Sequence, residues 1–453
     1  MSDLFSLLSL GSAGIAAQNS GISIASNNVA NANTEGYSRQ RVDLNALQGS
    51  PLVGGVRSGA PDRIADNLLG GRIRLASSSL TMSKTSAMAL GDLESRITSG
   101  PSLGQKLSEM FASFGQAAGA PTDPIARTAV VESMQQLVEG VRRRAAELAD
   151  MQKEFNQSIR EKVAKASELA ERLAQANLAV AKTNDGVAKD QRDMVAKQLS
   201  ELVGGTARVD ADGQMRFVLD GGAVLVDGKR AAKLEAGTDP VTGDVTVAVV
   251  DGNAKRDVTG SITGGSAGAL IGVRDGALKQ ARTDLDQFAF DLATSSNATH
   301  RTFAGMDGVS GRDLFTQPTT VAGAAAALAI DPGIDADPDT LALGAVGAGQ
   351  GSNAGALALF QNATKPLAAS GRTLGDSALE FASKIGRAAS TANADVSRDE
   401  LVSQHLASLH DSLSGVDLQE EMTNLSRFEH ASSAMTKFVS TIDGLLGDLI
   451  DRL

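Results

Sequence analysis

The chain has 453 residues, with 42 Lys or Arg against 53 Asp or Glu, so its formal net charge is -11. This balance argues against nucleic-acid binding, which is driven by clustered cations. The absence of Cys excludes disulfides, thiolate nucleophiles and Cys-ligated zinc. Aromatic residues make up only 3% and Trp is absent, which favours closely packed long helices over a pocket lined with rings.

The N-terminal segment is typical of an amphipathic helix. Its first basic residue is Arg39, so it lacks the positive region of a secretory signal, and no apolar run is long enough for a membrane span. A seven-residue apolar repeat indicates a coiled-coil stripe. The stripe is Leu8, Ile15, Ile22 and Val29, and a second row contains Leu4, Gly11, Ala25 and Ala32.

The stretch SNNVANANTEGYSRQRV, residues 26–42, follows this helix. Asn tolerates left-handed backbone and Gly36 permits a positive φ, so we expect the chain to turn a corner here. Residues 49–63, GSPLVGGVRSGAPDR, have the Gly and Pro punctuation of a loop.

Helical periodicity dominates the middle of the chain, and one interval interrupts it. Residues 205–262 alternate apolar and polar side chains and break at Asp-Gly pairs, which predicts a small β-rich insert with hairpin turns. Asp210 and Asp212 are better explained by turn chemistry than by calcium. Residues 305–352 predict a short strand, a turn and one helical turn. The expected helices cover about 62–98, 104–117, 124–182, 187–203, 266–304, 353–363 and 373–414.

The C-terminal segment forms a second amphipathic helix, and Asp417 with Glu420 has the spacing of a capping box at its start. Its apolar stripe must pair with the first helix, with the body or with other copies, because exposing it to water is costly. One row of the stripe is Leu418, Leu425, Ser432, Val439, Leu446 and Leu453, and the other is Glu421, Phe428, Met435, Ile442 and Leu449.

No catalytic constellation is present in the sequence. There is neither a nucleophile elbow nor a phosphate loop. The histidines, His300, His405, His410 and His430, lack metal-ligand spacing and are expected at or near the surface. The run Arg142–Arg144 is expected to be a solvated helix face. The sequence therefore predicts a protein that is not an enzyme and has no cofactor or metal.

These observations predict a mainly α fold with a small β-rich inserted domain. Residues 1–55 plus 415–453 are expected to form a terminal coiled-coil domain. Residues 56–204 plus 263–414 are expected to form a rod-like helical bundle, and residues 205–262 the insert.

Read together, the two chain ends resemble a known family. Ser26–Asn31 and Asn33–Gln40 resemble the N-terminal signature of bacterial flagellar rod, hook and hook-associated proteins. The closing GVDLQEEMTNLSRFEHASSAMTKFVSTIDGLLGDLI resembles their C-terminal signature. Three internal stretches, residues 123–140, 190–205 and 264–300, resemble the FlgK family, the hook-side hook–filament junction proteins. Residues 305–352 are too short for the outer β-domain of larger members.

The resemblance implies a structural protein of the bacterial flagellum that self-assembles into a ring between hook and filament. Its terminal helices would pair and line the inner tube. Implied partners are other copies, the hook protein, a second junction protein (the third hook-associated protein) and an export chaperone at the C-terminal helix. Implied localisation is extracellular, after type III export without a cleavable signal peptide. The alternatives are a hook or distal rod protein and, from another class, an extracellular coiled-coil binding module.

The residues expected at subunit interfaces come from both ends of the chain. They are Leu8, Ile15, Ile22, Asn27, Asn28, Val29, Asn31, Gly36, Tyr37, Leu418, Leu425, Phe428, Met435, Val439, Ile442, Leu446 and Leu449.

Overall fold

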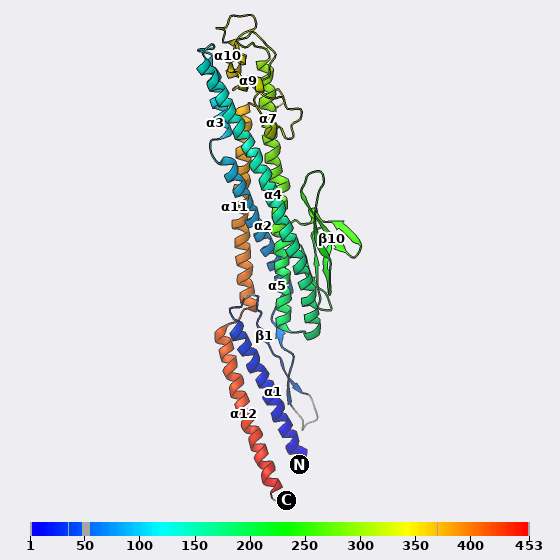
Figure 1. Cartoon of the computed structure of the whole chain (residues 1–453). Coiled ribbons are helices and arrows are strands. Elements are labelled where there is room, and N and C mark those ends of the chain that lie inside the picture. Colours follow the sequence, from blue (N-terminus) through cyan, green and yellow to red (C-terminus); the bar gives the residue numbers. More distant parts are fainter. Residues whose placement is uncertain (1, 35, 48–54, 369, 452–453) are drawn as a thin grey trace.

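The computed structural model describes residues 2–34, 36–47, 55–368 and 370–451. The molecule is elongated: a bundle of long helices continues at one end into a narrower pair of helices that holds both chain termini (Figure 1). This pair consists of α1 (Ser2–Asn31) and α12 (Leu418–Ile450). The predicted fold class, mainly α with paired terminal helices and a small β-rich insert, is confirmed.

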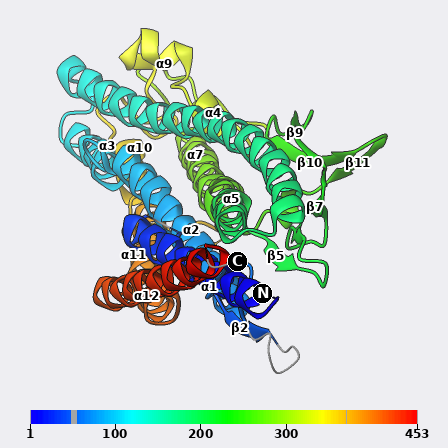
Figure 2. The same ribbon diagram turned by 90° about the horizontal axis from the view of Figure 1, so that it is seen from below.

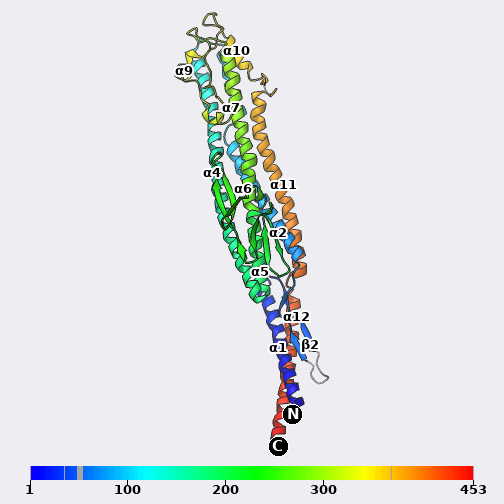
Figure 3. The ribbon, with the colours of Figure 1, turned by 90° about the vertical axis from the view of Figure 1, so that its right-hand side faces the viewer.

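Two short antiparallel ladders follow α1. β1 (Gln40–Arg41) pairs with β4 (Asp62–Arg63), and β2 (Leu44–Leu47) pairs with β3 (Gly55–Ser58). The β2–β3 hairpin lies beside α1 (Figure 3). The interpretation of residues 49–63 as a loop is therefore wrong for 55–58 and 62–63, because these strands are too short for alternation to reveal them. The prediction is confirmed for 59–61, and its part over 49–54 lies outside the described residues.

The rod is a bundle of helices that run along one axis. Its longest member, α4 (Pro124–Thr183), has 60 residues; the Asp123 side chain caps its start, and Asn184, with φ of 50°, ends it. α2 (Asn67–Thr98) and α11 (Leu374–Ser414) pack along each other. The other rod helices are α3 (Leu103–Ala117), α5 (Gly186–Val203), α6 (Gly265–Val273), the π-helical turn η2 (Arg274–Leu278), α7 (Lys279–His300) and α10 (Ala354–Gln361).

A continuous apolar core joins these helices to the insert. Leu, Val, Met and Ala side chains provide most of it, and a few Phe side chains such as Phe111, Phe114 and Phe288 fill its larger spaces. Burial of this surface, at about 25 cal/mol per Å², is the main source of the rod's stability.

The insert forms two antiparallel sheets that project beside α4 (Figure 2). Sequential hairpins build both, with turns at the Asp-Gly pairs that the sequence indicated, such as Asp212–Gly213. The first sheet contains β5 (Thr206–Val209), β6 (Met215–Val218), β7 (Val224–Asp227) and β8 (Arg230–Ala231). The second contains β9 (Lys233–Thr238), β10 (Val245–Asp251) and β11 (Ala254–Asp257), followed by the 3-10 turn η1 (Thr259–Ser261).

Buried polar side chains of α4 attach the insert to the rod. Asn177 exchanges two hydrogen bonds with the backbone of Met215, at 2.8 and 2.9 Å. Asn156 accepts from the Val245 N–H at 3.0 Å. Because these side chains satisfy buried strand-edge groups, they fix the position of the sheets on the helix. In the first turn, the Asp210 carboxylate accepts from two backbone N–H groups, which is the expected turn chemistry.

The expectation of a solvated Arg142–Arg144 face is wrong for Arg144. This side chain is 2% exposed. Its guanidinium donates to the carbonyls of Ile97, Pro101 and Gly140, at 2.9 to 3.1 Å. Arg144 therefore binds carbonyls at the C-terminal end of α2, where helix carbonyls lack intrahelical partners.

Short elements form the far end of the rod: α8 (Ala324–Ala327), α9 (Pro332–Ala336) and the 3-10 turn η3 (Pro338–Thr340). The strand predicted in this region is reduced to an isolated bridge between Phe315 and Ile330. Asn297 of α7 is fully buried and accepts from the N–H groups of Leu314 and Phe315. Hydrogen bonds from the loop backbone to a polar side chain of α7 thus hold these loops in position.

His300 is also fully buried, so the expectation of a histidine at or near the surface is wrong here. Its Nδ1 lies 2.8 Å from the Arg312 carbonyl and its Nε2 accepts from the Ala342 N–H at 2.9 Å. Nδ1 therefore carries the proton of a neutral ring that joins two loop segments.

We expect acid to weaken this end of the rod through His300. Burial lowers the pKa of His300 below its ordinary value of 6.5. The unfolded state therefore binds the proton first, and the stability contributed is present above pH 6.5 and lost as the pH falls through the folded-state pKa. One such group changes the free energy of unfolding by at most about 1.4 kcal/mol per pH unit.

Hydrogen exchange at the Ala342 amide between pH 7 and pH 5, corrected for intrinsic rates, checks this expectation. His300→Gln should flatten the dependence, whereas His405→Gln, on an exposed position of α11, should leave it unchanged. An equal pH dependence in both variants would assign the effect to other groups.

Candidate assembly interface at the terminal helices

The face of α1 that meets α12 is made of small residues. Gly11, Gly14, Ala17, Gly21 and Ala25 are all buried. A Cβ built on Gly21 would lie 2.8 Å from the ring of Phe428, and one on Gly14 or Gly11 would collide with Met435 or Val439 respectively. Residue numbers in contact rise along α1 while those of their partners fall along α12, so the two helices are antiparallel. The glycines allow a closer backbone approach than larger side chains permit.

The predicted stripe on α1 does not lie on this line. Leu8, Ile15, Ile22 and Val29 are half-buried and lie beside it; the last three each follow a line residue directly. Of the predicted second row, Gly11 and Ala25 do lie on this line. The larger row lies beside it because α12 supplies the large side chains and α1 the space for them.

On α12 the predicted rows lie mainly toward α1. Ile442 and Leu446 are each 7% exposed, and Leu425, Phe428, Met435 and Val439 are half-buried. Leu418 and Leu449 lie outside the seam, 47% and 41% exposed.

Asn28 is the last buried residue on the face of α1 that meets α12, near the C-terminal end of the helix, and is 0% exposed. Its Nδ2 donates to the Gln40 carbonyl at 2.8 Å and to Glu421 Oε2 at 3.0 Å. Its Oδ1 accepts from the Tyr37 hydroxyl at 2.8 Å and from the Gln40 N–H at 3.0 Å. The amide thus uses its full hydrogen-bonding capacity to join α1, the corner after it and α12.

The other residues of the Asn-rich corner have smaller roles within the chain. Gly36 has φ of 78°, as the corner requires. Asn31 donates to the Asn27 carbonyl at 3.0 Å, while the side chain of Asn27 is exposed. Burial, with nearby carboxylates, raises the pKa of Tyr37 to about 12, so its hydroxyl stays a donor. Within the chain that donor serves Asn28.

A second set of polar contacts joins the terminal pair to the rod. We call the connecting residues, 36–43, 62–66 and 414–417, the neck. Arg39 binds Glu421 at 2.7 Å and Glu420 at 2.6 Å. Asp190 of α5 accepts from the Ser38 backbone and hydroxyl and pairs with Arg63 at 2.8 Å. These partners are far apart in sequence, and no local pattern pointed to them.

The outer surface of the terminal pair is partly apolar and uncovered. Exposed side chains include Phe5 at 58%, Met422 at 55%, Leu445 at 51% and Ile450 at 63%. Exposed apolar patches of this kind mark protein–protein contact surfaces. Within the described residues, no group of His, Asp and Glu is arranged to hold a metal ion. None of the described helices is long and apolar enough to cross a membrane.

Comparisons with known proteins agree with this architecture. Residues 90–315 match the family model for the flagellar hook-associated protein FlgK helical domain, and residues 8–37 match the flagella basal body rod protein model. The first match contains all three internal stretches that separated the FlgK family from rod and hook proteins in the sequence.

The flagellar hook-associated protein 1 of Bacillus subtilis is 27% identical over 97% of this chain and 96% of its own. That of Escherichia coli is 28% identical over 68% of this chain, and the match spans only 60% of the relative. The flagellar hook junction protein FlgK from Burkholderia pseudomallei has the same fold, with a TM-score of 0.69 over 77% of this chain and 100% of that chain, at 15% identity. The chain belongs to the FlgK family of flagellar hook-associated proteins.

Proposed function

We propose that this chain is a structural subunit of the flagellar hook–filament junction and that its copies assemble through their terminal helix pairs. The carrying observation is the glycine-lined pairing of α1 and α12, which leaves apolar side chains exposed along the outside of the pair. Water contact with this surface is unfavourable, so burial against neighbouring copies stabilises the assembly.

We propose separate roles for the interface residues that the sequence suggested. Phe428, Met435 and Ile442 hold the pair together, and Asn28 with Tyr37 closes it. The flanking Leu8, Ile15, Ile22 and Val29, with the exposed Leu418 and Leu449, are available to neighbours. Asn27, with its exposed side chain, belongs to this second group.

Membership of the family supports a set of proposed partners. A ring of copies would contact the hook protein on one side and a second junction protein on the other, outside the cell, and would act by binding and not by catalysis. A chaperone that covers the exposed apolar face of α12 would keep the chain from associating before export.

Deletion of the gene in the source organism tests the proposal. Electron microscopy should show complete hooks without filaments, and flagellin should accumulate in the medium. Missing hooks would instead assign the chain to the hook or distal rod. Normal flagella would leave only an extracellular binding module.

A further inference from the structure

A hollow of about 370 Å³ lies beside α1, where the terminal pair meets the rod. Ser20, Ile24 and Asn27 of α1 line one side of it, and Pro61 and Val187 line the other. Its volume is within the range of about 300–1,000 Å³ typical of ligand pockets. Val187 is 44% exposed, so part of the wall is apolar and uncovered. The hollow therefore has room for large aliphatic side chains and an apolar wall to contact them.

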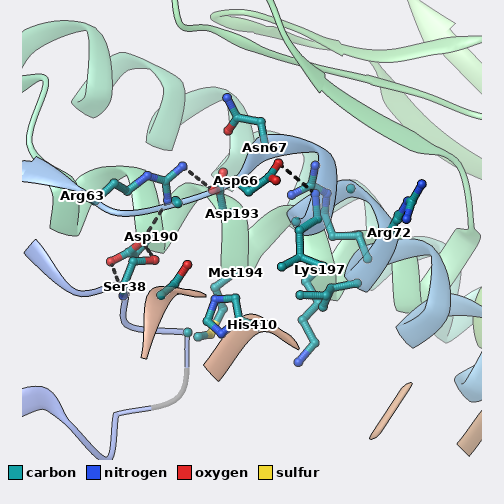
Figure 4. Close-up of a pocket in the computed structure, with 18 of the residues that line it drawn as sticks. Ser38, Arg63, Asp66, Asn67, Arg72, Asp190, Asp193, Met194, Lys197 and His410 are labelled. Carbon is teal, nitrogen blue, oxygen red and sulfur yellow. Dashed lines mark hydrogen bonds and ion pairs between the residues drawn. The ribbon is translucent and has the colours of Figure 1, made fainter. Parts of the chain in front are cut away.

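Polar contacts hold the walls of the hollow in place. Asp190 lies about one turn after Val187 in α5 and accepts hydrogen bonds from the Ser38 N–H and hydroxyl, at 3.0 and 2.9 Å. It also pairs with Arg63 at 2.8 Å (Figure 4). A side chain that enters the hollow does not have to order it first, which lowers the cost of binding.

Two large apolar side chains of α12 are exposed at the same height along the terminal pair. Met422 is 55% exposed and Leu418 is 47% exposed. Because Asn28 lies beside Glu421, Met422 is level with Asn27, which lines the hollow, and Leu418 lies about one turn closer to the rod. Exposure of both side chains to water is unfavourable.

The hollow and these two side chains face opposite sides of the terminal pair. A helix turns by about 100° per residue. The hollow residues of α1 lie on average about 100° around the helix from those that contact α12, and Leu418 and Met422 lie about 100° from the residues of α12 that contact α1. Because the helices are antiparallel, these rotations carry the two surfaces to opposite sides. A chain therefore cannot fill its own hollow with these side chains.

An unpaired charge accompanies each surface. Glu429 lies on the same face of α12 as Met422, about two turns further from the rod and level with Ser20. Arg57 of β3 is next to Ser58, whose hydroxyl lies 3.5 Å from that of Ser20. Since successive strand residues point to opposite faces, Arg57 points away from α1. Both charged side chains are exposed, and neither has an ion pair among the described residues.

The remaining charges do not oppose a contact between the two surfaces. No Lys or Arg occurs from Asp399 to Ser426, so the surface that carries Leu418 and Met422 is acidic. Its exposed carboxylates are Asp411, Asp417 and Glu420. The segments around the hollow are nearly balanced. Apart from the Arg63–Asp190 pair, the charged residues of 40–47, 55–63 and 181–190 are Arg41, Arg57, Lys182 and Lys189 with Asp43, Asp62 and Asp185.

We propose that Leu418 and Met422 of one copy enter the hollow of the next copy in the same ring, an inference that rests on the proposed assembly function. Glu429 of the first copy then lies beside Arg57 of the second. The two surfaces differ, so the contact is heterologous and can be repeated from copy to copy. They lie at one height on opposite sides of the pair, so the repeat leads around the ring and not along its axis.

Disulfide trapping in cells tests this contact, since the chain has no Cys of its own. Cells whose only copy carries Asn27→Cys with Met422→Cys are oxidised, and covalent multimers are separated by mass. Docking raises the local concentration of the two thiols, so multimers should be at least about tenfold more abundant than with Asn27→Cys and Thr423→Cys. Thr423 is the matched control because it is exposed and follows Met422 directly, on another face. Mass spectrometry identifies the linked peptides, and equal yields would overturn the proposal.

A charge exchange distinguishes this contact from random collision. Glu429→Arg alone or Arg57→Glu alone should lower the yield of the 27–422 link several-fold, and the two together should restore it. Arg387→Glu, at an exposed position of the rod, is the control and should leave the yield unchanged. If the cysteines prevent assembly, motility in soft agar of the same charge variants without cysteines decides. Loss in both single variants without recovery in the double variant would reject the contact, as would full motility in all three.

The two proposals fail separately. If deletion gives hooks without filaments but no 27–422 link forms, the junction role stands and the contact within the ring is wrong. If the link forms but deletion leaves normal flagella, the contact between copies stands and the junction role is wrong.

Discussion

Replacing Asn28 by Asp will release the terminal helix pair from the neck while the rod stays folded. The substitution removes the Nδ2 donor that binds the Gln40 carbonyl and Glu421, both at or below 3.0 Å. It also places a second carboxylate against Glu421, which is 3% exposed. Loss of the partner of a buried charge, with like charges in its place, costs about 3–5 kcal/mol.

Limited proteolysis and hydrogen exchange, resolved by segment, measure the effect. Amides of α1 and α12 should exchange faster in the variant, those of α4 should not, and cells should lose motility in soft agar. Asn27→Asp is the matched control, because its side chain is exposed and only its carbonyl is used. Comparable losses at both positions would contradict the special role of Asn28.

The sequence predicted helix boundaries well because the signals that set them are local. Asp123 before Pro124, Thr373 and Asp417 each accept hydrogen bonds from backbone N–H groups of the first helical turn. The β insert was recognisable for the same reason, since alternation and Asp-Gly turns act between residues that are close in sequence.

Long-range polar contacts could not be predicted in this way. Ser38 and Asp190 are 152 positions apart, and Arg39 and Glu421 are 382 positions apart. Each of these residues is of a polar or charged type that is common on protein surfaces. Only the packing of α5 and α12 against the neck brings them together, with Ser38, Asp190 and Glu421 buried.

The seam of α1 was only partly predicted, through Gly11 and Ala25 of the second row, for a different reason. A periodicity that weights large apolar residues selects Leu8, Ile15 and Ile22, whereas a glycine contributes nothing to it. The contact instead depends on the absence of a side chain at Gly14 and Gly21. The side chains that fill the resulting space, Met435 and Phe428, belong to the other helix. Reading both ends as one antiparallel unit is needed to see this match.

Replacing Gly21 by Val will separate α1 from α12. A Cβ at this position lies 2.8 Å from Cγ, Cδ1 and Cε1 of Phe428. Since Cγ is close to the root of that side chain, the ring cannot move away without a shift of the helix itself. Overpacking of this kind costs about 3 kcal/mol.

Two matched substitutions isolate the cause. Gly91→Val, in the middle of α2, meets nothing within 4 Å of its Cβ and should leave stability nearly unchanged. Gly14→Ala meets the mobile end of Met435, which can swing aside, so its effect should be small. Far-UV circular dichroism and proteolysis of the terminal segments measure the three variants, with motility as the cellular readout. If Gly14→Ala separates the helices as strongly as Gly21→Val, the interface tolerates no added side chain and the mobility of Met435 does not matter. If neither variant separates them, the close approach of the helices is not essential to the pair.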